Sequence, residues 1–374
     1  MPQLAGPGWT AAAARPEQAA VTTIVGVAPA LPPHRYAQAE MTEMFAALVG
    51  LADADRGVLE QLHHSARVET RHLVLPKEQY ADLDDFGKAN DAFLAHATEL
   101  GSTALLDALA RAGLQPSDVD LIITATVTGV AAPSLDARIA HRIGLRPDVR
   151  RVPLFGLGCV AGAAGIARLH DHLVGHPDQV AVLVSVELCS LTVQRDDVSM
   201  ANLVASGLFG DGASAVVAMG ADRAARTQAT GPVVLDSRSR LYPDSLRTMG
   251  WDVGSGGLKI VLDPGVPQLI EQHLAADAGA FLADHGLTPA DIGVWVSHPG
   301  GPKVIEAIER ALELPSDALK ATWDSLAQVG NLSSSSVLHV LHDTLAQRPP
   351  GTGEPAVLMA MGPGFCAELV LLRW

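Results

Sequence analysis

The sequence predicts an α/β fold in which two similar halves share a mostly buried sheet flanked by helices. Short apolar runs, rich in valine and isoleucine, alternate with longer segments of helical periodicity, a pattern typical of such layered folds. Hydrophobic residues make up 48% of the 374 residues and charged residues 18%, which indicates a folded chain with a sizeable core. This length fits either two domains or one large duplicated domain.

The apolar runs place the strands, and the helical periodicity places the helices between them. Strands are predicted over residues 121–125, 180–186, 213–219, 294–297, 356–361 and 368–372. Helices are predicted over 103–112, 160–174, 302–312 and 332–346. The strands are apolar along their whole length, as expected of a sheet covered on both faces.

An internal repeat predicts that the chain is a duplication. GLQPSDVDLIITA (113–125) matches GLTPADIGVWVSH (286–298) at an offset of 173 residues, and LFGLGCVAGAAGIARLHDHL (154–173) matches LAQVGNLSSSSVLHVLHDTL (326–345) at an offset of 172. VLVSV (182–186) and VLMAM (357–361) follow in the same order at 175. We therefore expect an N-terminal tail over 1–20, a first half over 21–225 and a second half over 226–374.

Charge and cysteine usage exclude several classes of protein. With 26 basic and 41 acidic residues the net charge is −15, which argues against a nucleic-acid-binding face. Three cysteines without a C-x-x-C spacing favour neither a disulfide framework nor a structural zinc site. No apolar run reaches the roughly 18 residues of a membrane span, and the first twenty residues do not resemble a signal peptide. We expect a cytoplasmic protein.

Cys159 is the strongest candidate for a nucleophile. It follows Gly156 and Gly158 in a tight turn and opens a helix of small residues. Amides and the macrodipole at a helix N-terminus stabilise a thiolate and lower a cysteine pKa from about 8.5 to between about 3.5 and 7.5. The alternative is a small buried hydrophobic residue, which is the interpretation we give to Cys189 and Cys366.

Two further polar residues occupy positions suited to chemistry. His298 ends a predicted strand just before a glycine-rich loop, where open α/β sheets bind ligands; the alternative is a structural histidine. Asn331 stands opposite Cys159 in the repeat and can donate hydrogen bonds to an oxyanion, or serve only as a helix cap. Cys, His and Asn together suggest a decarboxylative Claisen condensation of acyl thioesters, in which the His/Asn pair holds the enolate.

These residues lie in segments that resemble the type III polyketide synthases, the chalcone synthase superfamily. The segments are GLGCVAGAAG, ELCSLTVQ, GLFGDGASAVV, VSHPGGPKVIEA, GNLSSSSVL and MGPGFCAELVLLRW, and the resemblance covers residues 20–374. LFGLGCVAGAAG and MGWDVGSGGLKIVLDP are most similar to the bacterial branch that makes alkylpyrones and alkylresorcinols. The resemblance implies a thiolase-like αβαβα fold, a homodimer, acyl-CoA and malonyl-CoA substrates, and no metal or redox cofactor.

The resemblance also implies roles for individual residues. Cys159 would carry the acyl group, while His298 and Asn331 would bind the thioester carbonyl and support malonyl decarboxylation. Phe209 would be a gatekeeper between the CoA tunnel and the cavity, with Ile260 at the second gatekeeper position, where plant enzymes have phenylalanine. The remaining cavity positions are Thr192 and Ser333, which match residues that steer chain length and cyclisation, and Trp251, which replaces a small residue of the plant enzymes.

Lys303 could reach the phosphates of CoA or could be a solvated lysine at a helix start. The expected reaction is loading of an acyl group onto Cys159, extension by malonyl-CoA and closure to a pyrone or resorcinol. Two alternatives remain open at this point. One is a ketoacyl-carrier-protein synthase III, which performs a single condensation, and the other is a catalytically idle thiolase-fold subunit that serves for binding.

Overall fold

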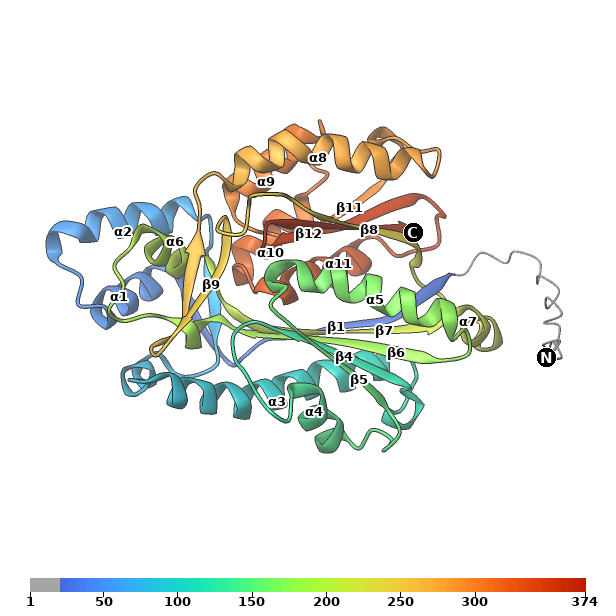
Figure 1. The fold of residues 1–374 in the computed structure, drawn as a ribbon, viewed down its shortest axis with the longest axis horizontal. Coiled ribbons are helices and arrows are strands. Elements are labelled where there is room, and N and C mark those ends of the chain that lie inside the picture. Colours follow the sequence, from blue (N-terminus) through green and yellow to red (C-terminus); the bar gives the residue numbers. More distant parts are fainter. Residues whose placement is uncertain (1–20) are drawn as a thin grey trace, which may run out of the picture.

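The computed structural model describes residues 21–374, so the tail predicted over 1–20 lies outside the described residues. Within this part of the chain, nine strands form one mixed sheet that runs through the molecule (Figure 1). From one edge to the other the strands are β5 (Arg150–Phe155), β4 (Leu121–Thr126), β6 (Val180–Leu188), β7 (Asp211–Gly220), β1 (Thr22–Ala30), β8 (Val233–Leu241), β13 (Cys366–Arg373), β12 (Pro355–Gly362) and β11 (Val294–Ser297). Each predicted strand falls within one of these.

The two halves of the sheet repeat one pairing pattern. β4 and β6 are parallel, and β7 and β1 continue antiparallel from them; β11 and β12 are likewise parallel, with β13 and β8 following antiparallel. The halves meet where Thr22 and Thr23 of β1 pair with Val234 and Val233 of β8. The predicted duplication is therefore confirmed in the topology, and β5 is the extra strand of the first half.

Helices divide the fold into five layers, which Figure 1 shows from top to bottom. The central layer holds α5 (Ala161–Gly175) and α11 (Ser336–Gln347), between the two halves of the sheet. The outer layers hold α3 (Phe86–Arg111) and α4 (Leu135–Ile143) on the first half, and α8 (Val266–Ala283) and α9 (Pro302–Ala311) on the second. The helix α10 (Lys320–Val329) lies beside α11. The α/β fold class is confirmed as the αβαβα arrangement.

Alternating side chains assign each strand to two cores, as the period of a strand requires. In β4, Leu121 and Ile123 pack into the central core with α5 and α11, whereas Ile122 packs toward α3 and α4. In β6, Leu183 faces the central core and Val182 faces outward. Both faces are covered, which explains why these strands are apolar throughout.

Smaller elements gather at one end of the molecule, at the left of Figure 1. They are α1 (Gln38–Leu48), α2 (Asp53–Ser65), α6 (Met200–Leu208), the β2 (His34–Ala37) and β3 (Thr70–Leu73) pair, and the hairpin of β9 (Met249–Gly254) and β10 (Gly257–Leu262). The short helix α7 (Ala221–Thr227) lies at the opposite end.

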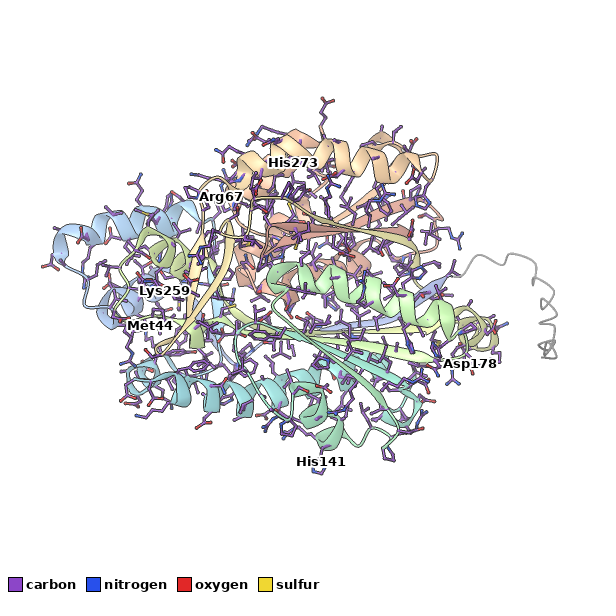
Figure 2. The ribbon with its side chains drawn as sticks, in the orientation of Figure 1. Met44, Arg67, His141, Asp178, Lys259 and His273 are labelled. Atoms are coloured by element: carbon purple, nitrogen blue, oxygen red, sulfur yellow. The ribbon has the colours of Figure 1, made fainter. Side chains whose placement is uncertain are left out.

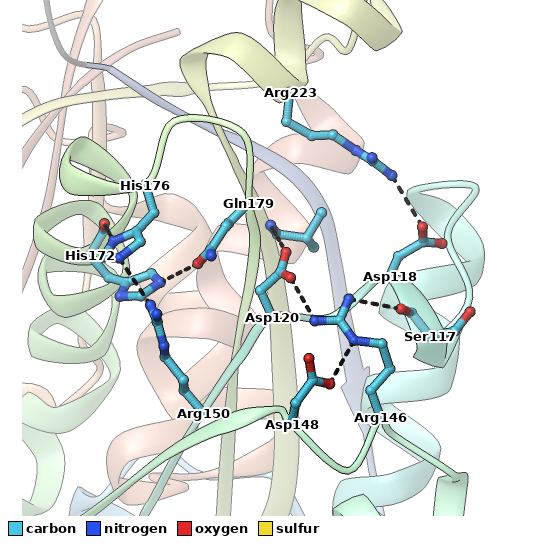
Figure 3. Close-up of polar contacts among 11 residues, drawn as sticks. Ser117, Asp118, Asp120, Arg146, Asp148, Arg150, His172, His176, Gln179 and Arg223 are labelled. Atoms are coloured by element: carbon cyan, nitrogen blue, oxygen red, sulfur yellow. Dashed lines mark hydrogen bonds and ion pairs between the residues drawn. The ribbon is translucent and has the colours of Figure 1, made fainter.

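Polar contacts fix the N-terminal ends of the parallel strands (Figure 3). The Arg146 guanidinium donates to Asp120 at 2.9 Å and to Asp148 at 3.0 Å. The second carboxylate oxygen of Asp120 accepts the backbone N–H of Val180 at 2.9 Å. This network holds the starts of β4, β5 and β6 together, at the sheet end opposite to the one where open α/β folds bind ligands.

Glycine allows the two halves to approach closely at the start of α5. A Cβ atom added at Gly162 would lie 2.4 Å from the backbone oxygen of Ser334 and 2.6 Å from the side chain of Val337. The small residues predicted to permit close packing at this helix therefore do so against the other half of the chain.

We expect Gly162→Val to destabilise the fold by about 1–3 kcal/mol or more, because the contacted atom is backbone and cannot move aside. Gly279→Ala in α8 is the matched control, since an added Cβ there meets no atom within 4 Å. That control should gain about 0.5–1 kcal/mol from helix propensity. Urea unfolding followed by circular dichroism measures both changes, and equal stability of the two variants would contradict the close approach.

Candidate active site

A cavity of about 680 Å³ lies between the two halves and the end formed by α2, α6 and the β9–β10 hairpin. Its wall is mostly apolar, which is typical of sites that take small organic ligands. Eight of the nine residues singled out from the sequence line it: Cys159, Phe209, Trp251, Ile260, His298, Lys303, Asn331 and Ser333. The ninth, Thr192, lines a separate hollow of about 50 Å³.

Two glycines shape the turn that carries Cys159. Gly156 and Gly158 have φ of +95° and +55°, a region that favours glycine. A Cβ at Gly158 would also lie 2.7 Å from the ring of Pro363. The 3₁₀ turn Gly158–Val160 then leads into α5, so Cys159 stands just before the helix N-terminus, as predicted.

The Cys159 thiol is buried. The residue is 8% exposed, and its Sγ lies 3.7 Å from Ser333 Oγ. Burial raises the pKa of the thiol to about 12, outweighing the hydrogen bond with Ser333, which lowers it. The expectation that the helix N-terminus lowers the pKa of this thiol is therefore not met, because the loss of solvation is the larger effect.

His298 follows β11 directly and is 4% exposed. Its backbone N–H donates to Met359 at 3.0 Å, while neither ring nitrogen has a hydrogen-bond partner among the described residues. Burial lowers the pKa of the imidazole to about 3. The neutral ring presents one donor and one acceptor to the cavity.

Two hydrogen bonds to backbone groups orient the Asn331 side chain. Its Oδ1 accepts the N–H of Ser333 at 2.8 Å, and its Nδ2 donates to the Gly300 carbonyl at 3.3 Å. Because an amide nitrogen carries two N–H groups, one donor stays free. Asn331 stands before the 3₁₀ turn Ser333–Ser335 that leads into α11, whereas Cys159 lies within the matching turn Gly158–Val160 that leads into α5. The two residues therefore come from corresponding segments of the two halves, as the repeat predicts, but the residue at the place equivalent to Cys159 is Ser334.

Comparisons with known proteins show the family to which the chain belongs. The model of the chalcone and stilbene synthase N-terminal domain matches residues 10–223, and that of the C-terminal domain matches residues 234–374. The chain belongs to the chalcone and stilbene synthase family. It is a type III polyketide synthase, an acyltransferase that condenses acyl groups with malonyl-CoA by decarboxylation.

Several relatives of this synthase span nearly its whole length. A 1,3,6,8-tetrahydroxynaphthalene synthase of Streptomyces peucetius subsp. caesius is 58% identical over 94% of this chain and 93% of its own. An alpha-pyrone synthesis polyketide synthase-like protein of Mycobacterium tuberculosis is 30% identical over 94% and 91%. The crystal structure of the 1,3,6,8-tetrahydroxynaphthalene synthase of Streptomyces coelicolor A3(2) has a TM-score of 0.88 at 29% identity, covering 94% and 99%. The ketoacyl-carrier-protein synthase and idle-subunit alternatives are not supported.

Phe209, Trp251 and Ile260 form the boundary between the large cavity and the small hollow of this synthase, since all three line both. Phe209 also forms a backbone bridge with Asn331. The positions singled out as gatekeepers thus lie between two spaces. Thr192 lies on the far side, where its hydroxyl donates to the carbonyl of Cys189 at 2.8 Å.

Cationic side chains near the cavity differ in whether a carboxylate pairs with them. Lys303, in the first turn of α9, is exposed and makes no ion pair within residues 21–374. Arg67 is paired with Glu306 at 3.3 Å, and Lys259 with Asp197 at 3.3 Å. Figure 2 labels Arg67 and Lys259 at the end where α1, α2 and the β9–β10 hairpin gather.

Sequence reasoning assigned no role to Glu187, a carboxyl that the structure buries completely beside the site. It accepts hydrogen bonds from Val127 N–H at 3.1 Å, from Thr128 Oγ1 at 2.9 Å and from the Ser334 hydroxyl. Burial raises the pKa of this carboxyl. The signal in the sequence is an acid at the end of an otherwise apolar strand, which must find partners in the fold.

No group of three or more His, Cys, Asp or Glu side chains within residues 21–374 could hold a metal ion. In the same residues, no helix combines the length and apolar character that crossing a membrane requires.

Proposed function

We propose that Cys159 carries the acyl chain and that His298 and Asn331 hold the thioester oxygen of malonyl-CoA while it loses CO2. The observation that supports this assignment is the convergence of the three side chains on one enclosed cavity, from both halves of the fold. The neutral imidazole of His298 has one N–H that can donate to the thioester oxygen and one nitrogen that can accept a proton from Cys159. The negative charge that forms on the sulfur as the proton leaves raises the pKa of the imidazole and so favours this transfer.

Loading begins with proton transfer from Cys159 to His298. The sulfur attacks the acyl-CoA carbonyl, a new carbon–sulfur bond forms, and the bond to CoA sulfur breaks. The CoA thiolate then takes the proton from His298, which returns to its neutral form. Because burial keeps the thiol protonated, this transfer is what makes the nucleophile.

Replacing His298 by glutamine should slow alkylation of Cys159 by iodoacetamide about 10²-fold at pH 7, because the general base is lost. In the His298→Gln variant the rate should rise about tenfold per pH unit up to pH 10, as expected for a thiol with a pKa of about 12. Mass spectrometry of the Cys159 peptide measures both rates. Equal rates for the variant and the wild-type protein at pH 7 would contradict the role of His298.

Extension uses the same pocket. The malonyl carbon–carbon bond breaks, CO2 leaves, and the electron pair forms an enolate whose oxygen accepts hydrogen bonds from His298 and the free N–H of Asn331. The enolate carbon attacks the acyl group on Cys159, and the sulfur leaves as the new carbon–carbon bond forms. Repetition lengthens an unreduced poly-β-ketone. Each step draws its carbanion from decarboxylation, so we propose that CoA thioesters are sufficient substrates without a further cofactor.

We propose that the product is a polyhydroxylated naphthalene built from malonyl units, as the name of the Streptomyces peucetius relative specifies for that enzyme. The ten ring carbons and alternating hydroxyls of such a product correspond to five two-carbon units joined without reduction. Alkylpyrones or alkylresorcinols are the second candidate. They are favoured by the mostly apolar wall of the large cavity and are compatible with the M. tuberculosis relative.

Product mass decides between these candidates. The purified protein is incubated with malonyl-CoA alone, and in parallel with malonyl-CoA and a panel of acyl-CoA starters of increasing length. We expect a ten-carbon aromatic product from malonyl-CoA alone, whereas an alkylpyrone synthase would give only products that retain the starter chain. A single linear ketoacyl product, or no release of CoA, would overturn the proposed function.

We also propose that the synthase is a homodimer joined at the edge of β5. This strand is paired only with β4, and its outer residues Val152 and Phe155 are 39% and 54% exposed, an unusual arrangement for an edge strand left in water. Light scattering after gel filtration should give twice the mass of the chain. A monomeric mass would reject the dimer. The cytoplasmic location stays a prediction, supported by three free cysteines.

A further inference from the structure

A fully buried arginine stands beside the small hollow without a carboxylate partner. Arg71, in β3, is 1% exposed, and within residues 21–374 no carboxylate oxygen lies within 4.0 Å of its guanidinium. The nearby Asp211 carboxylate is occupied elsewhere, accepting from Val74 N–H and Ser190 N–H, each at 2.8 Å. Burial lowers the pKa of Arg71 only to about 10, so it is a cation at neutral pH.

Most of the hydrogen-bonding capacity of this cation is unused. Nη1 donates to the carbonyls of Ser206 at 2.5 Å and Phe209 at 2.9 Å. Nε and Nη2 are buried and have no partner in the described structure, which leaves three of the five guanidinium N–H groups free. Leaving such donors unpaired in the interior is costly, so an oxygen ligand that reached them would relieve this cost.

Arg71 lines the hollow of about 50 Å³, together with Ser206 and Phe209, whose carbonyls it contacts. Other polar side chains of the wall make hydrogen bonds within the protein: Ser190 with Asp211, Thr192 with the Cys189 carbonyl, Ser206 with His63, and Asn202 with the carbonyls of Gln194 and Asp197. Among the lining residues, Arg71 is therefore the one that carries unpaired buried side-chain atoms.

The hollow is a continuation of the reaction cavity. Phe209, Trp251 and Ile260 line both spaces, and apolar residues of α1, including the Met44 labelled in Figure 2, form the far wall. A volume of 50 Å³ is several times the roughly 10–15 Å³ that a single water needs, so it holds a group of a few heavy atoms, such as a carboxylate.

We propose that Arg71 and this hollow form a subsite that binds an anionic oxygen group at the distal end of the growing poly-β-ketone. The inference rests on the proposed function and specifies how the enzyme would hold the far end of its chain. The anionic oxygen has two possible sources, namely the free carboxylate of a malonyl starter and the enolate of a terminal β-ketone. Holding that end keeps the chain extended until the ring-forming carbons are in place.

Two variants test the subsite from opposite walls. Arg71→Lys keeps the charge but removes the planar fork of donors. Ala205→Leu, on α6, fills the hollow without changing Arg71. The matched controls are Arg56→Lys, a half-buried arginine outside the hollow that pairs with Glu43, and Ala205→Ser, which leaves most of the hollow open.

Three rates are measured for each variant: acylation of Cys159, decarboxylation of malonyl-CoA, and formation of each product by mass. We expect the ratio of full-length product to short lactones to fall at least tenfold in Arg71→Lys and Ala205→Leu. Acylation and decarboxylation should stay within about twofold of the wild-type rates, which a merely structural role would not allow. Both control variants should keep the wild-type ratio.

The two sources of the oxygen are distinguished by the starter. A change confined to reactions with malonyl-CoA alone identifies the starter carboxylate, and a change that also occurs after priming with acetyl-CoA identifies the enolate. An unchanged product ratio in both variants would overturn the subsite, as would a parallel loss of all three rates and of thermal stability in both. Absence of polyketide from the wild-type protein would refute the proposed function instead.

Discussion

The rate of polyketide formation should fall on the order of 10⁴-fold or more in the Cys159→Ala variant, because the acyl group then has no thiol to which it can be attached. The loss should be confined to condensation. His298 and Asn331 are untouched by the substitution, so malonyl-CoA should still be decarboxylated to acetyl-CoA. Mass spectrometry of the product and of acetyl-CoA separates the two steps in one reaction mixture.

The folding of this variant is not in question, since alanine replaces a small buried side chain whose only contact of the hydrogen-bond type is with Ser333. Cys366→Ala is the matched control, because that thiol lies in β13 and contacts the Pro363 carbonyl at 3.2 Å. It should keep nearly full activity. Polyketide formation by Cys159→Ala at the wild-type rate would remove the basis of the proposed mechanism.

The Asn331→Ala variant should lose about 10²–10³-fold in the rate of malonyl-CoA decarboxylation, the usual effect of removing one oxyanion donor. Acylation of Cys159 should change far less, since Asn331 is assigned to the enolate of the extender unit. Release of CO2 from labelled malonyl-CoA measures the first rate, and single-turnover mass spectrometry measures the second.

Asn331→Asp controls for the structural role of this side chain, because an aspartate can still accept the Ser333 N–H. It lacks the amide donor, so decarboxylation should fall as it does in the alanine variant while thermal stability is retained. If the aspartate variant decarboxylated malonyl-CoA at the wild-type rate, Asn331 would act only as the cap of the helical segment that follows it.

The layered fold could be predicted from the sequence because the residue patterns that define its strands and helices are local. Uniformly apolar runs gave β4, β6 and β12 within one or two residues. Strands β1, β5 and β8 of the nine-stranded sheet were not predicted. β1 contains glycine and proline, β5 begins with two arginines and is exposed along its edge, and β8 carries an aspartate and two arginines. The helix predicted over 103–112 is the end of the 26-residue α3, whose earlier turns carry polar residues.

Only part of the candidate site could be predicted from the sequence. The repeat correctly brought Cys159 and Asn331 to one cavity, because both lie in corresponding segments at the centre of a duplicated fold, although Ser334 and not Asn331 is the residue equivalent to Cys159. The state of the thiol was predicted wrongly, because the helix N-terminus is local whereas desolvation depends on everything packed around the sulfur. Thr192 proved to lie beyond Phe209, and Arg71 gave no signal, since its burial depends on elements far apart in the sequence.

The duplicated fold offers a route by which such an enzyme could arise. Cys159 lies in the turn that leads into α5, and Asn331 lies just before the corresponding turn that leads into α11. The pocket therefore takes residues from both copies of the repeat. An ancestor half as long would have needed two identical chains to enclose such a chamber, and joining them would allow each copy to acquire side chains of its own.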